Sequence, residues 1–398
     1  MSSGSETSRQ PLAALTGLRF VAALAVVVSH FMQSGTVPAV PAVLDFLDGG
    51  RTAVSLFFVL SGFVLALNYP AVAGRAQLRR FYVARFARIY PMVVLALLIS
   101  APTVASAWNS PDHLLQWYSI ESGAGPKVAA SLVAQLTMIT AWFPVAAINQ
   151  PWNGPAWSVS CEVFFYALFP LVIAQLAGRR LRVLAAIVLA GWAAQAMWIW
   201  AVRAALPPNR EGFLVSQFPV PHLFEFVLGI CAAVWFTRSG RQSLELPGRR
   251  RGSLAVATCG IVVLSAAELS DPRYLLMSPL FAVLIVGLAT RPASGSSWLA
   301  WPVLVLLGES SYALYLLHVP LLHLFDLAGV SGVAGWVAML AVIALSVVAF
   351  RWYETPMRLV LRRQLAGRDV ARATAAQAPR RLVEPSPQAA AAGGGSCG

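Results

Sequence analysis

Apolar residues in this chain gather in long blocks that short polar stretches separate. Eleven blocks can be delimited, at residues 12–33, 52–69, 89–107, 129–147, 157–177, 182–204, 216–237, 253–270, 274–290, 299–325 and 332–352. Most are close to the ~20 residues that an α-helix needs to cross a hydrocarbon core. Backbone polar groups in lipid must be satisfied within their own segment, and the alternating pattern of a membrane barrel is absent. The pattern predicts an all-α, polytopic membrane helix bundle.

Composition supports this class. Of the 398 residues, 58% are hydrophobic and only 11% are charged, whereas soluble domains carry about a quarter charged residues. The first block is too long for a signal-peptide core and contains Arg19, so we expect it to remain as a span. Cys161, Cys231 and Cys259 lie in apolar segments without CxxC spacing, and we expect neither a metal site nor a disulfide framework.

The distribution of charge predicts the topology. The net charge is +13, but the arginines lie between the apolar blocks, as the positive-inside rule expects, and therefore do not indicate nucleic acid. With every arginine-rich stretch in the cytoplasm, both termini are inside and the number of spans is even. We expect ten spans and one re-entrant segment, at 129–157, which ends in a Pro- and Trp-rich stretch. A full crossing at 129–147 is the alternative, and it would place the arginines of 179–182 outside.

We expect three regions along the chain. Residues 1–11 form a short cytoplasmic tail, 12–356 the transmembrane domain, and 357–398 a basic, low-complexity, disordered cytoplasmic tail. Any chemistry must therefore be done by the helix bundle. The richness in arginine and alanine indicates a GC-rich genome, and we expect a multi-pass protein of a bacterial plasma membrane.

Two ionisable residues share a face of the first block. Arg19 and His30 are eleven residues apart, so at about 100° per residue their side chains point the same way, ~16.5 Å apart along the helix axis. Alone, Arg19 could reach the membrane surface and His30 could serve an interhelical hydrogen bond. Because ionisable groups are unfavourable within a span, the pair together favours a functional site.

A series of motifs resembles the membrane-bound acyltransferase-3 family. Arg19 and His30 match its first-span arginine and histidine, and Trp157, Ser158 and Glu162 match its Trp-Ser-x-x-x-Glu element. Further matches follow in order at 50–62, 80–91, 153–162, 224–229, 308–318 and 353–356, so the resemblance covers about 15–356. It implies an integral membrane O-acyltransferase that uses acyl-CoA as co-substrate, with no bound cofactor or metal.

The resemblance implies roles for several residues. Arg85 and Arg88, adjacent on one helical face, would bind the donor phosphates together with Arg19; topogenic charge or lipid contact is the alternative. His30 would be the general base, or a covalent acyl carrier, on an acceptor hydroxyl. Glu162 would orient His30 or the acceptor, although an ion pair that only holds helices together is also possible.

Further polar and aromatic side chains are candidates for substrate binding. Asn153, Trp157 and Ser158 precede Glu162, and Trp157 could stack on a sugar or belong to an interfacial belt. Tyr315 and His318 lie on one face of the tenth span, and we expect His318 to position substrate or support the structure. Ser61 lacks a nucleophile elbow and is interpreted as a packing contact.

The acceptor is left open between a glycosylated natural product, such as a macrolide, and an envelope glycan. Acyl chain length and oligomeric state are not predicted. A proton-coupled transporter without acyl-transfer activity is the alternative function, since ten spans with ionisable residues at the midplane would also suit a carrier.

Overall fold

The computed structural model describes residues 10–47, 50–239, 247–267, 273–290 and 297–366, and within them every regular element is a helix. The long elements are α1 (Gln10–Gln33), α3 (Arg51–Asn68), α4 (Gly74–Trp108), α8 (Trp157–Leu176), α9 (Leu181–Ala205), α11 (Pro219–Arg238), α13 (Pro247–Ala266), α14 (Tyr274–Ala289), α16 (Ser311–Leu327) and α17 (Val333–Ala349). The shorter elements are α2 (Pro41–Leu47), α5 (Pro111–Tyr118), α6 (Ala124–Leu136), η2 (Thr140–Trp142), α7 (Ala146–Asn149), η3 (Gly154–Ala156), α10 (Pro208–Ser216), η4 (Trp298–Ala300), α15 (Pro302–Glu309), η5 (Phe350–Glu354) and α18 (Thr355–Ala366).

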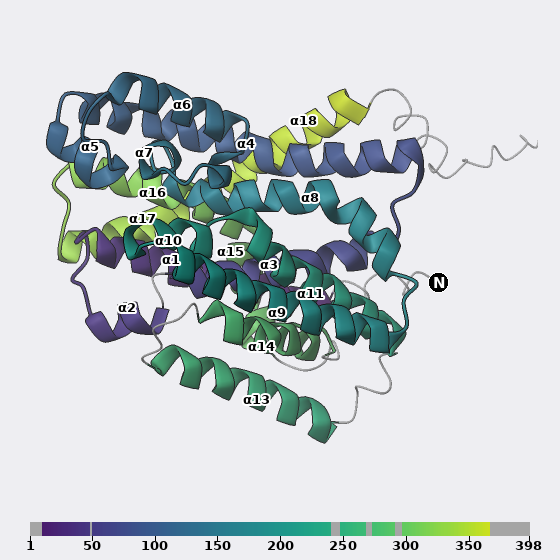
Figure 1. Ribbon diagram of the computed structural model, residues 1–398. Helices are drawn as coiled ribbons and strands as arrows, with labels where there is room; N and C mark the ends of the chain where they lie inside the picture. Colours follow the sequence, from purple (N-terminus) through teal and green to yellow (C-terminus); the bar gives the residue numbers. More distant parts are fainter. Residues whose placement is uncertain (1–9, 48–49, 240–246, 268–272, 291–296, 367–398) are drawn as a thin grey trace, which may run out of the picture.

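The long helices run side by side as one bundle (Figure 1). Among the described residues seven helices are long and apolar enough to cross a membrane, and the bent pair α15 and α16 would make an eighth. Two further expected spans correspond to shorter apolar helices at Gly252–Ala266 and Tyr274–Ala289. The predicted class of an all-α, polytopic membrane bundle is confirmed.

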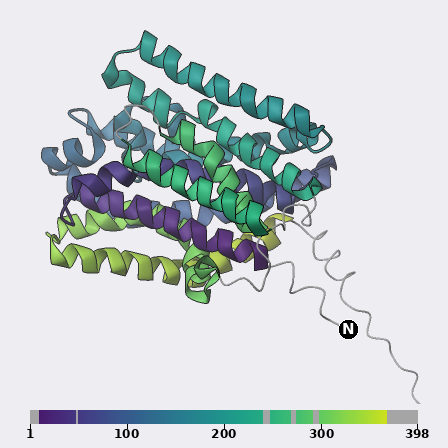
Figure 2. The same ribbon diagram turned by 90° about the horizontal axis from the view of Figure 1, so that it is seen from below.

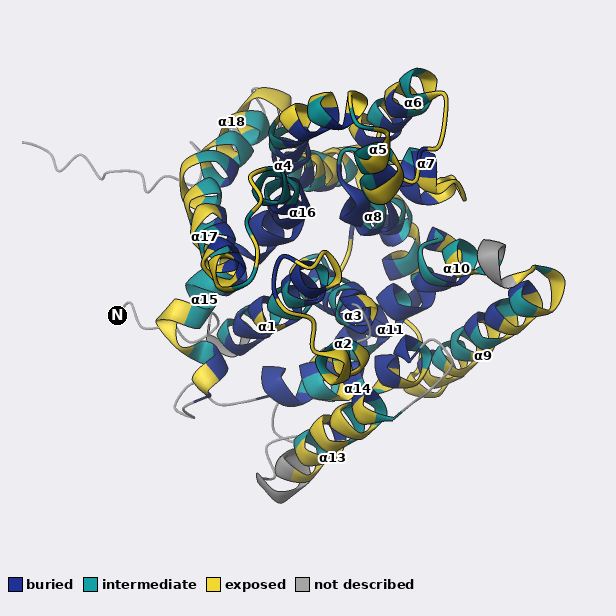
Figure 3. Ribbon diagram, turned by 90° about the vertical axis from the view of Figure 1, so that its left-hand side faces the viewer, coloured by how far each residue is buried: buried dark blue, intermediate teal, exposed yellow. Residues whose placement is uncertain are grey.

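The centre of the bundle is formed by α1, α3 and α11. α1 contacts α3, α14, α15, α16 and α17, and α3 and α11 form the most extensive helix pair. Seen from below, α1, in purple, runs between green helices and the yellow-green helices near the end of the chain (Figure 2). Viewed along the bundle, α3 and α11 are largely buried whereas α9 and α13 present exposed faces at the edge (Figure 3). Exposed apolar side chains such as Leu189 and Val263 on these edge helices are what a lipid-facing surface requires.

The basic stretch before the third apolar block is helical. α4 begins at Gly74 and continues for 35 residues, about 52 Å at 1.5 Å per residue, which is longer than a membrane core. The sequence between Gly74 and Pro91 contains no helix breaker and is rich in arginine and alanine, which favour helix. Arg85 and Arg88 are therefore held rigidly one turn apart.

The segment expected to be re-entrant is broken into short pieces. Between α6 and α8 the chain makes only α7 and two 3₁₀ turns, gathered with α5 and α6 at one end of the bundle (Figure 1). Met138 and Trp152 adopt positive φ angles of 57° and 68°, so continuous helix is interrupted at both. Gln135 Nε2 donates to the carbonyl oxygens of Pro151 and Asn153, at 3.2 and 3.0 Å, and holds the returning segment against α6.

The predicted block 299–325 is divided by a 61° bend between α15 and α16, which the hydrophobic pattern did not indicate. At the end of α15, Gly308 lies against the backbone of α1, where an added Cβ would stand 1.9 Å from the Thr16 carbonyl oxygen. Only glycine permits this approach. The bend directs the first turns of α16 into the centre of the bundle, where Tyr312, Tyr315 and His318 are buried.

The prediction of a disordered tail from residue 357 is wrong for residues 357–366, because helix α18 continues through Ala366. The π-helical turn η5 joins α17 to α18, which packs along the first turns of α4. Arg79 Nη2 donates to the Leu365 carbonyl oxygen at 2.7 Å and ties the end of α18 to α4. Tertiary contact thus stabilises a basic helix that composition alone suggested was unstructured. The remainder of that predicted tail, 367–398, and most of the predicted N-terminal tail lie outside the described residues.

Candidate active site

A cavity of about 530 Å³ opens among α1, α3, α4, α8, α16 and α18. We call it the inner cavity. It brings together six residues expected to be functional. They are Arg19 from α1, Arg85 and Arg88 from α4, Ser158 and Glu162 from α8, and Tyr315 from α16. The same cavity is lined by Arg358 and Arg362 of α18, which were not expected there. A concentration of guanidinium groups around one cavity suits a ligand with several negative charges.

Tyrosine rings position the guanidinium groups of the inner cavity. The Cζ atom of Arg85 lies 5.6 Å from the ring centroid of Tyr69 and 5.7 Å from that of Tyr166. Arg88 lies 5.6 Å from the ring of Tyr312. These cation–π contacts hold both arginines without consuming the N–H groups that a phosphate would accept from.

Glu162 belongs to this cavity. Tyr166 Oη donates to Glu162 Oε2 at 3.3 Å, and Ser61 Oγ lies 3.3 Å from the same tyrosine oxygen. Glu162 is also within electrostatic range of Arg19 and Arg88. The carboxylate thus balances part of the arginine charge. Ser61 forms part of the wall of this cavity.

His30 faces a different side chain, His318. His30 Nδ1 and His318 Nε2 are 3.0 Å apart, and His318 Nδ1 lies 2.6 Å from the Tyr315 carbonyl oxygen. Since a carbonyl oxygen only accepts, His318 carries its proton on Nδ1, and its neutral ring accepts at Nε2. His30 then donates from Nδ1 and keeps its lone pair on Nε2. This tautomer is the one that a general base requires. His318, rather than Glu162, lies at hydrogen-bond distance from His30.

A second cavity, of about 310 Å³, is lined by His30. We call it the outer cavity. Besides His30 and Trp157, its wall contains the amide side chains of Gln33, Gln150 and Gln217. Val54 and Tyr315 line both cavities, so the two cavities share a wall. Arg19 and His30 lie on one face of α1 but line different cavities. Arg19 lines the inner cavity and His30 the outer cavity, and the two cavities meet between them.

The boundary between the cavities is fixed by hydrogen bonds from the broken segment. Ser158, in the wall of the inner cavity, donates from Oγ to Tyr315 Oη at 2.8 Å, and Tyr315 Oη donates to the Pro155 carbonyl oxygen at 3.1 Å. Asn153 lines neither cavity; its Nδ2 donates to the Leu316 carbonyl oxygen at 2.9 Å. Of the expected substrate-binding residues, Trp157, Ser158 and Tyr315 lie at cavities, while Asn153 anchors α16.

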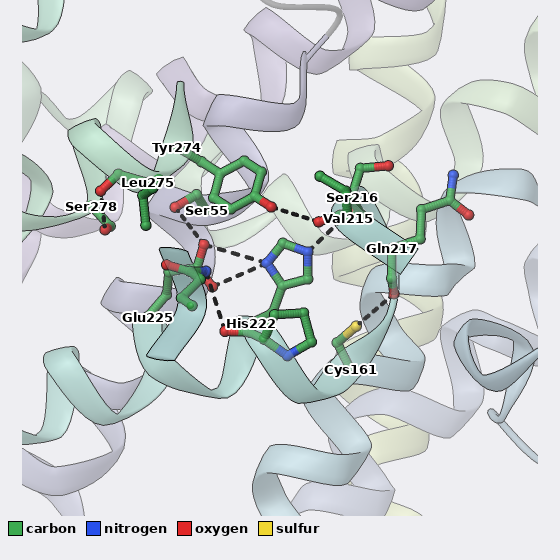
Figure 4. Close-up of polar contacts among 12 residues, drawn as sticks. Ser55, Cys161, Val215, Ser216, Gln217, His222, Glu225, Tyr274, Leu275 and Ser278 are labelled. Carbon is green, nitrogen blue, oxygen red and sulfur yellow. Dashed lines mark hydrogen bonds and ion pairs between the residues drawn. The ribbon is translucent and has the colours of Figure 1, made fainter. Parts of the chain in front are cut away.

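One wall of the outer cavity is held by a buried polar cluster (Figure 4). His222 Nδ1 lies 3.0 Å from Glu225 Oε2, and Ser55 Oγ donates to Glu225 Oε1 at 3.1 Å. The other ring nitrogen, Nε2, lies 3.1 Å from the Ser216 carbonyl oxygen. His222 and Glu225 thus pair within one turn of α11. The cluster fixes the backbone next to Gln217, whose side chain lines the outer cavity.

Sequence reasoning missed the α18 arginines and the glutamine side chains. Arg358 and Arg362 are four residues apart directly after the matched motif at 353–356, so their helical spacing was a usable signal. The three glutamines come from three distant parts of the chain and carried no such signal. Among the described residues no group of His, Cys, Asp and Glu is arranged to hold a metal ion.

A family model described as an acyltransferase domain matches residues 12–351, which is most of the chain and contains His30, His318 and all the arginines of the inner cavity except those of α18. The chain belongs to the acyltransferase-3 family. The resemblance seen in the motifs is confirmed, and this multi-pass membrane protein is an acyltransferase. Membership does not favour the transporter alternative.

Two relatives illustrate the range of the acyltransferase-3 family. The chain is 32% identical over 331 residues to the acyltransferase MdmB of Streptomyces mycarofaciens, covering 77% of this chain and 78% of that protein. It is 24% identical over 379 residues to the peptidoglycan O-acetyltransferase OatA of Listeria monocytogenes, covering 88% of this chain but 56% of that protein. No solved structure matches the chain.

Proposed function

We propose that the protein transfers a short acyl group from acyl-CoA, bound in the inner cavity, to a hydroxyl group bound in the outer cavity. The observation that carries this proposal is the wall shared by the two cavities, formed by Val54 and Tyr315. Phosphate-binding side chains lie on one side of the wall, and a histidine in the tautomer of a general base lies on the other. A two-substrate transfer needs this arrangement, because it must hold both reactants while excluding water.

The donor binds with its phosphates among the arginines and its thioester at the shared wall. Arg19 and His30 are separated by ~16.5 Å along α1, which is comparable to the length of a pantetheine arm. Arg85 and Arg88 present N–H groups suited to bidentate contact with phosphate oxygens. The arm would pass along α3, whose side chains from Val54 to Tyr69 line the inner cavity.

The reaction follows from the state of His30. Nε2 of His30 accepts the proton of the acceptor hydroxyl as its oxygen attacks the thioester carbonyl carbon, and the C–S bond breaks as the ester C–O bond forms. The Nδ1–H group of the resulting imidazolium continues to donate to His318 Nε2, which stabilises the charge. The proton then passes to the departing thiolate and regenerates the base. In the covalent variant, the same Nε2 attacks the thioester first.

The outer cavity has room for one sugar ring of the acceptor. The outer cavity, at about 310 Å³, is at the lower end of the ~300–1,000 Å³ range of small-molecule sites, so it suits a single sugar ring. Amide side chains form hydrogen bonds with carbohydrate hydroxyls, and an adjacent indole such as that of Trp157 stacks on the face of a sugar ring. The acceptor is therefore a sugar of an envelope glycan or of a glycosylated natural product such as a macrolide. The peptidoglycan O-acetyltransferase relative supports the carbohydrate class.

The protein resides in a bacterial plasma membrane with both termini in the cytoplasm. This orientation follows from the arginines of α4, of α18 and of the turn between α8 and α9, which lie at one end of the bundle (Figure 1). The inner cavity then opens to cytoplasmic acyl-CoA, and the outer cavity lies in the outer half of the membrane.

Label transfer tests the proposal. Purified full-length protein is mixed with radiolabelled acetyl-CoA and a panel of muropeptides, free sugars and glycosylated macrolides. Wild type is expected to label at least one acceptor, and His30→Ala to reduce the rate by about 10²–10⁴-fold, the usual contribution of a general base. His113→Ala, a histidine that lines neither cavity, serves as the matched control and retains activity. Transfer that is unchanged in His30→Ala would exclude this mechanism.

A further inference from the structure

The C-terminal helix α18 contributes charged side chains to the inner cavity. Arg358 and Arg362 line the cavity and are one helical turn apart, so they share a face of α18. The neighbouring Arg363 is exposed to solvent and lines neither cavity. Because Arg79 holds the end of α18 against α4, this face is fixed toward the cavity rather than loosely attached.

The guanidinium groups of this wall lack sufficient acceptors within the described part of the chain. The Nε atoms of Arg85, Arg358 and Arg362 are each buried, and no described group accepts a hydrogen bond from them. Buried N–H groups in folded proteins are almost always paired. Three such atoms around one cavity indicate that the missing acceptors belong to a ligand.

The balance of charge around the inner cavity also indicates a bound anion. Arg358 and Arg362 are within electrostatic range of each other and of Arg85 and Arg88. The carboxylates of Glu162 and Glu354 offset only part of the charge of the five arginines around the cavity. Like charges at short range destabilise one another unless an anion lies between them. A ligand with about three to four negative charges would balance the cluster.

The position of α18 indicates which phosphate of coenzyme A its arginines contact. The inner cavity follows α3 from Val54, at the shared wall, to Tyr69, a distance of about 22 Å at 1.5 Å per residue. Arg85 contacts the ring of Tyr69 and Arg362 is within electrostatic range of it, so both lie at the far end. In coenzyme A the 3′-phosphate is the phosphate farthest from the thioester, and it is a phosphomonoester with up to two charges.

We infer that Arg358 and Arg362 of α18 bind the 3′-phosphate of coenzyme A, so that this helix distinguishes coenzyme A from donors that lack the 3′-phosphate. The inference rests on the proposed function of the inner cavity as the donor site. Arg85 shares the far end with these two arginines, whereas Arg88, beside Tyr312, binds the diphosphate nearer the pantetheine arm.

Binding of coenzyme A and of 3′-dephospho-coenzyme A to the purified full-length chain tests the inference. Wild type is expected to prefer coenzyme A by about tenfold or more, the effect of hydrogen bonds to a charged group. In the double variant Arg358→Gln/Arg362→Gln the preference disappears, while the affinity for dephospho-coenzyme A is unchanged and shows that the site is folded. Arg363→Gln, which removes the same charge from the same helix, keeps the wild-type preference. If the double variant does not fold, Arg362→Gln alone is expected to reduce the preference by several-fold.

The outcomes separate the two proposals. If wild type binds both nucleotides equally, or if the double variant keeps the preference, the role of α18 is excluded while the donor site stands. If wild type binds neither nucleotide and transfers no label from acetyl-CoA, the proposed function and the inference fall together.

Discussion

At the scale of single residues, the proposed reaction depends on the protonation of two imidazole rings. The Tyr315 carbonyl oxygen fixes the proton of His318 on Nδ1, and His318 in turn fixes the proton of His30. His318 lies 288 residues from His30 in the chain. It does for His30 what a carboxylate does in many catalytic pairs, but without adding charge to a buried site.

Substitution of His318 tests this positioning role. His318→Ala is expected to lower kcat for acetyl transfer by about 10²-fold, because His30 loses the acceptor that orients its ring. The KM for acetyl-CoA stays the same, since the phosphates bind elsewhere. His318→Gln, whose side-chain oxygen can accept from His30 Nδ1, is expected to recover part of the activity. Equal loss in the alanine and glutamine variants, with a matching fall in thermal stability, would instead indicate a purely structural role.

Removal of the α4 guanidinium groups should raise the KM for acetyl-CoA, whereas substitution of His318 should lower kcat. The double variant Arg85→Gln/Arg88→Gln is expected to raise the KM for acetyl-CoA by about tenfold or more, because charge-assisted contacts to phosphate are lost. Steady-state kinetics in which acetyl-CoA is varied at fixed acceptor measure this, with Arg75→Gln, an exposed arginine at the start of the same helix, as the control. An unchanged KM for acetyl-CoA would place the donor phosphates elsewhere.

At the scale of elements, the site depends on how closely the central helices approach. Gly62 of α3 and Gly229 of α11 face each other's helices, and a Cβ on either would stand 2.0 Å from a backbone oxygen of the partner. Small residues at such crossings are the usual device for close packing in membranes. The crossing positions Ser55 and Val54, two turns earlier on α3, against the outer cavity and its polar cluster.

Enlarging one of these glycines should therefore separate the two helices. Gly62→Ala is expected to destabilise the protein by about 1–3 kcal/mol, as overpacking usually does. The measurement is thermal unfolding in detergent. Gly178→Ala is the control, since a Cβ at Gly178 meets no atom within 4 Å. Unfolding of both variants at the wild-type temperature would show that the crossing is less tight than described.

The partial segment between α5 and α8 also makes an element-scale prediction. If it does not cross the membrane, residue 121 is outside and residue 180 is inside. In a chain whose native cysteines are replaced by serine, Glu121→Cys should react with a membrane-impermeant maleimide added to intact cells. Arg180→Cys should react only after lysis. Labelling of Arg180→Cys in intact cells would favour the full crossing at 129–147.

At the scale of the whole molecule, sequence reasoning and structure agree on class and differ on assembly. Block length and the scarcity of charge suffice for the membrane class because lipid imposes one requirement on every span. The shared face of Arg19 and His30 follows from helical geometry alone. The meeting of His30 with His318 depends on the bend between α15 and α16, which apolar pattern cannot reveal because both halves are equally hydrophobic. Likewise, Glu162 faces arginines because of how α8 packs against α3, α4 and α11, which no local spacing shows.

The proposed reaction requires that the two cavities meet at one shared wall, and a variant that blocks this wall should stop it. Val54→Phe places a larger side chain where the cavities meet. Acetyl transfer from acetyl-CoA is measured with coenzyme A affinity in the same preparation. We expect coenzyme A affinity within about threefold of wild type and a rate of acetyl transfer lower by about 10²-fold, because the thioester no longer reaches His30. Acetyl transfer at the wild-type rate would contradict this requirement.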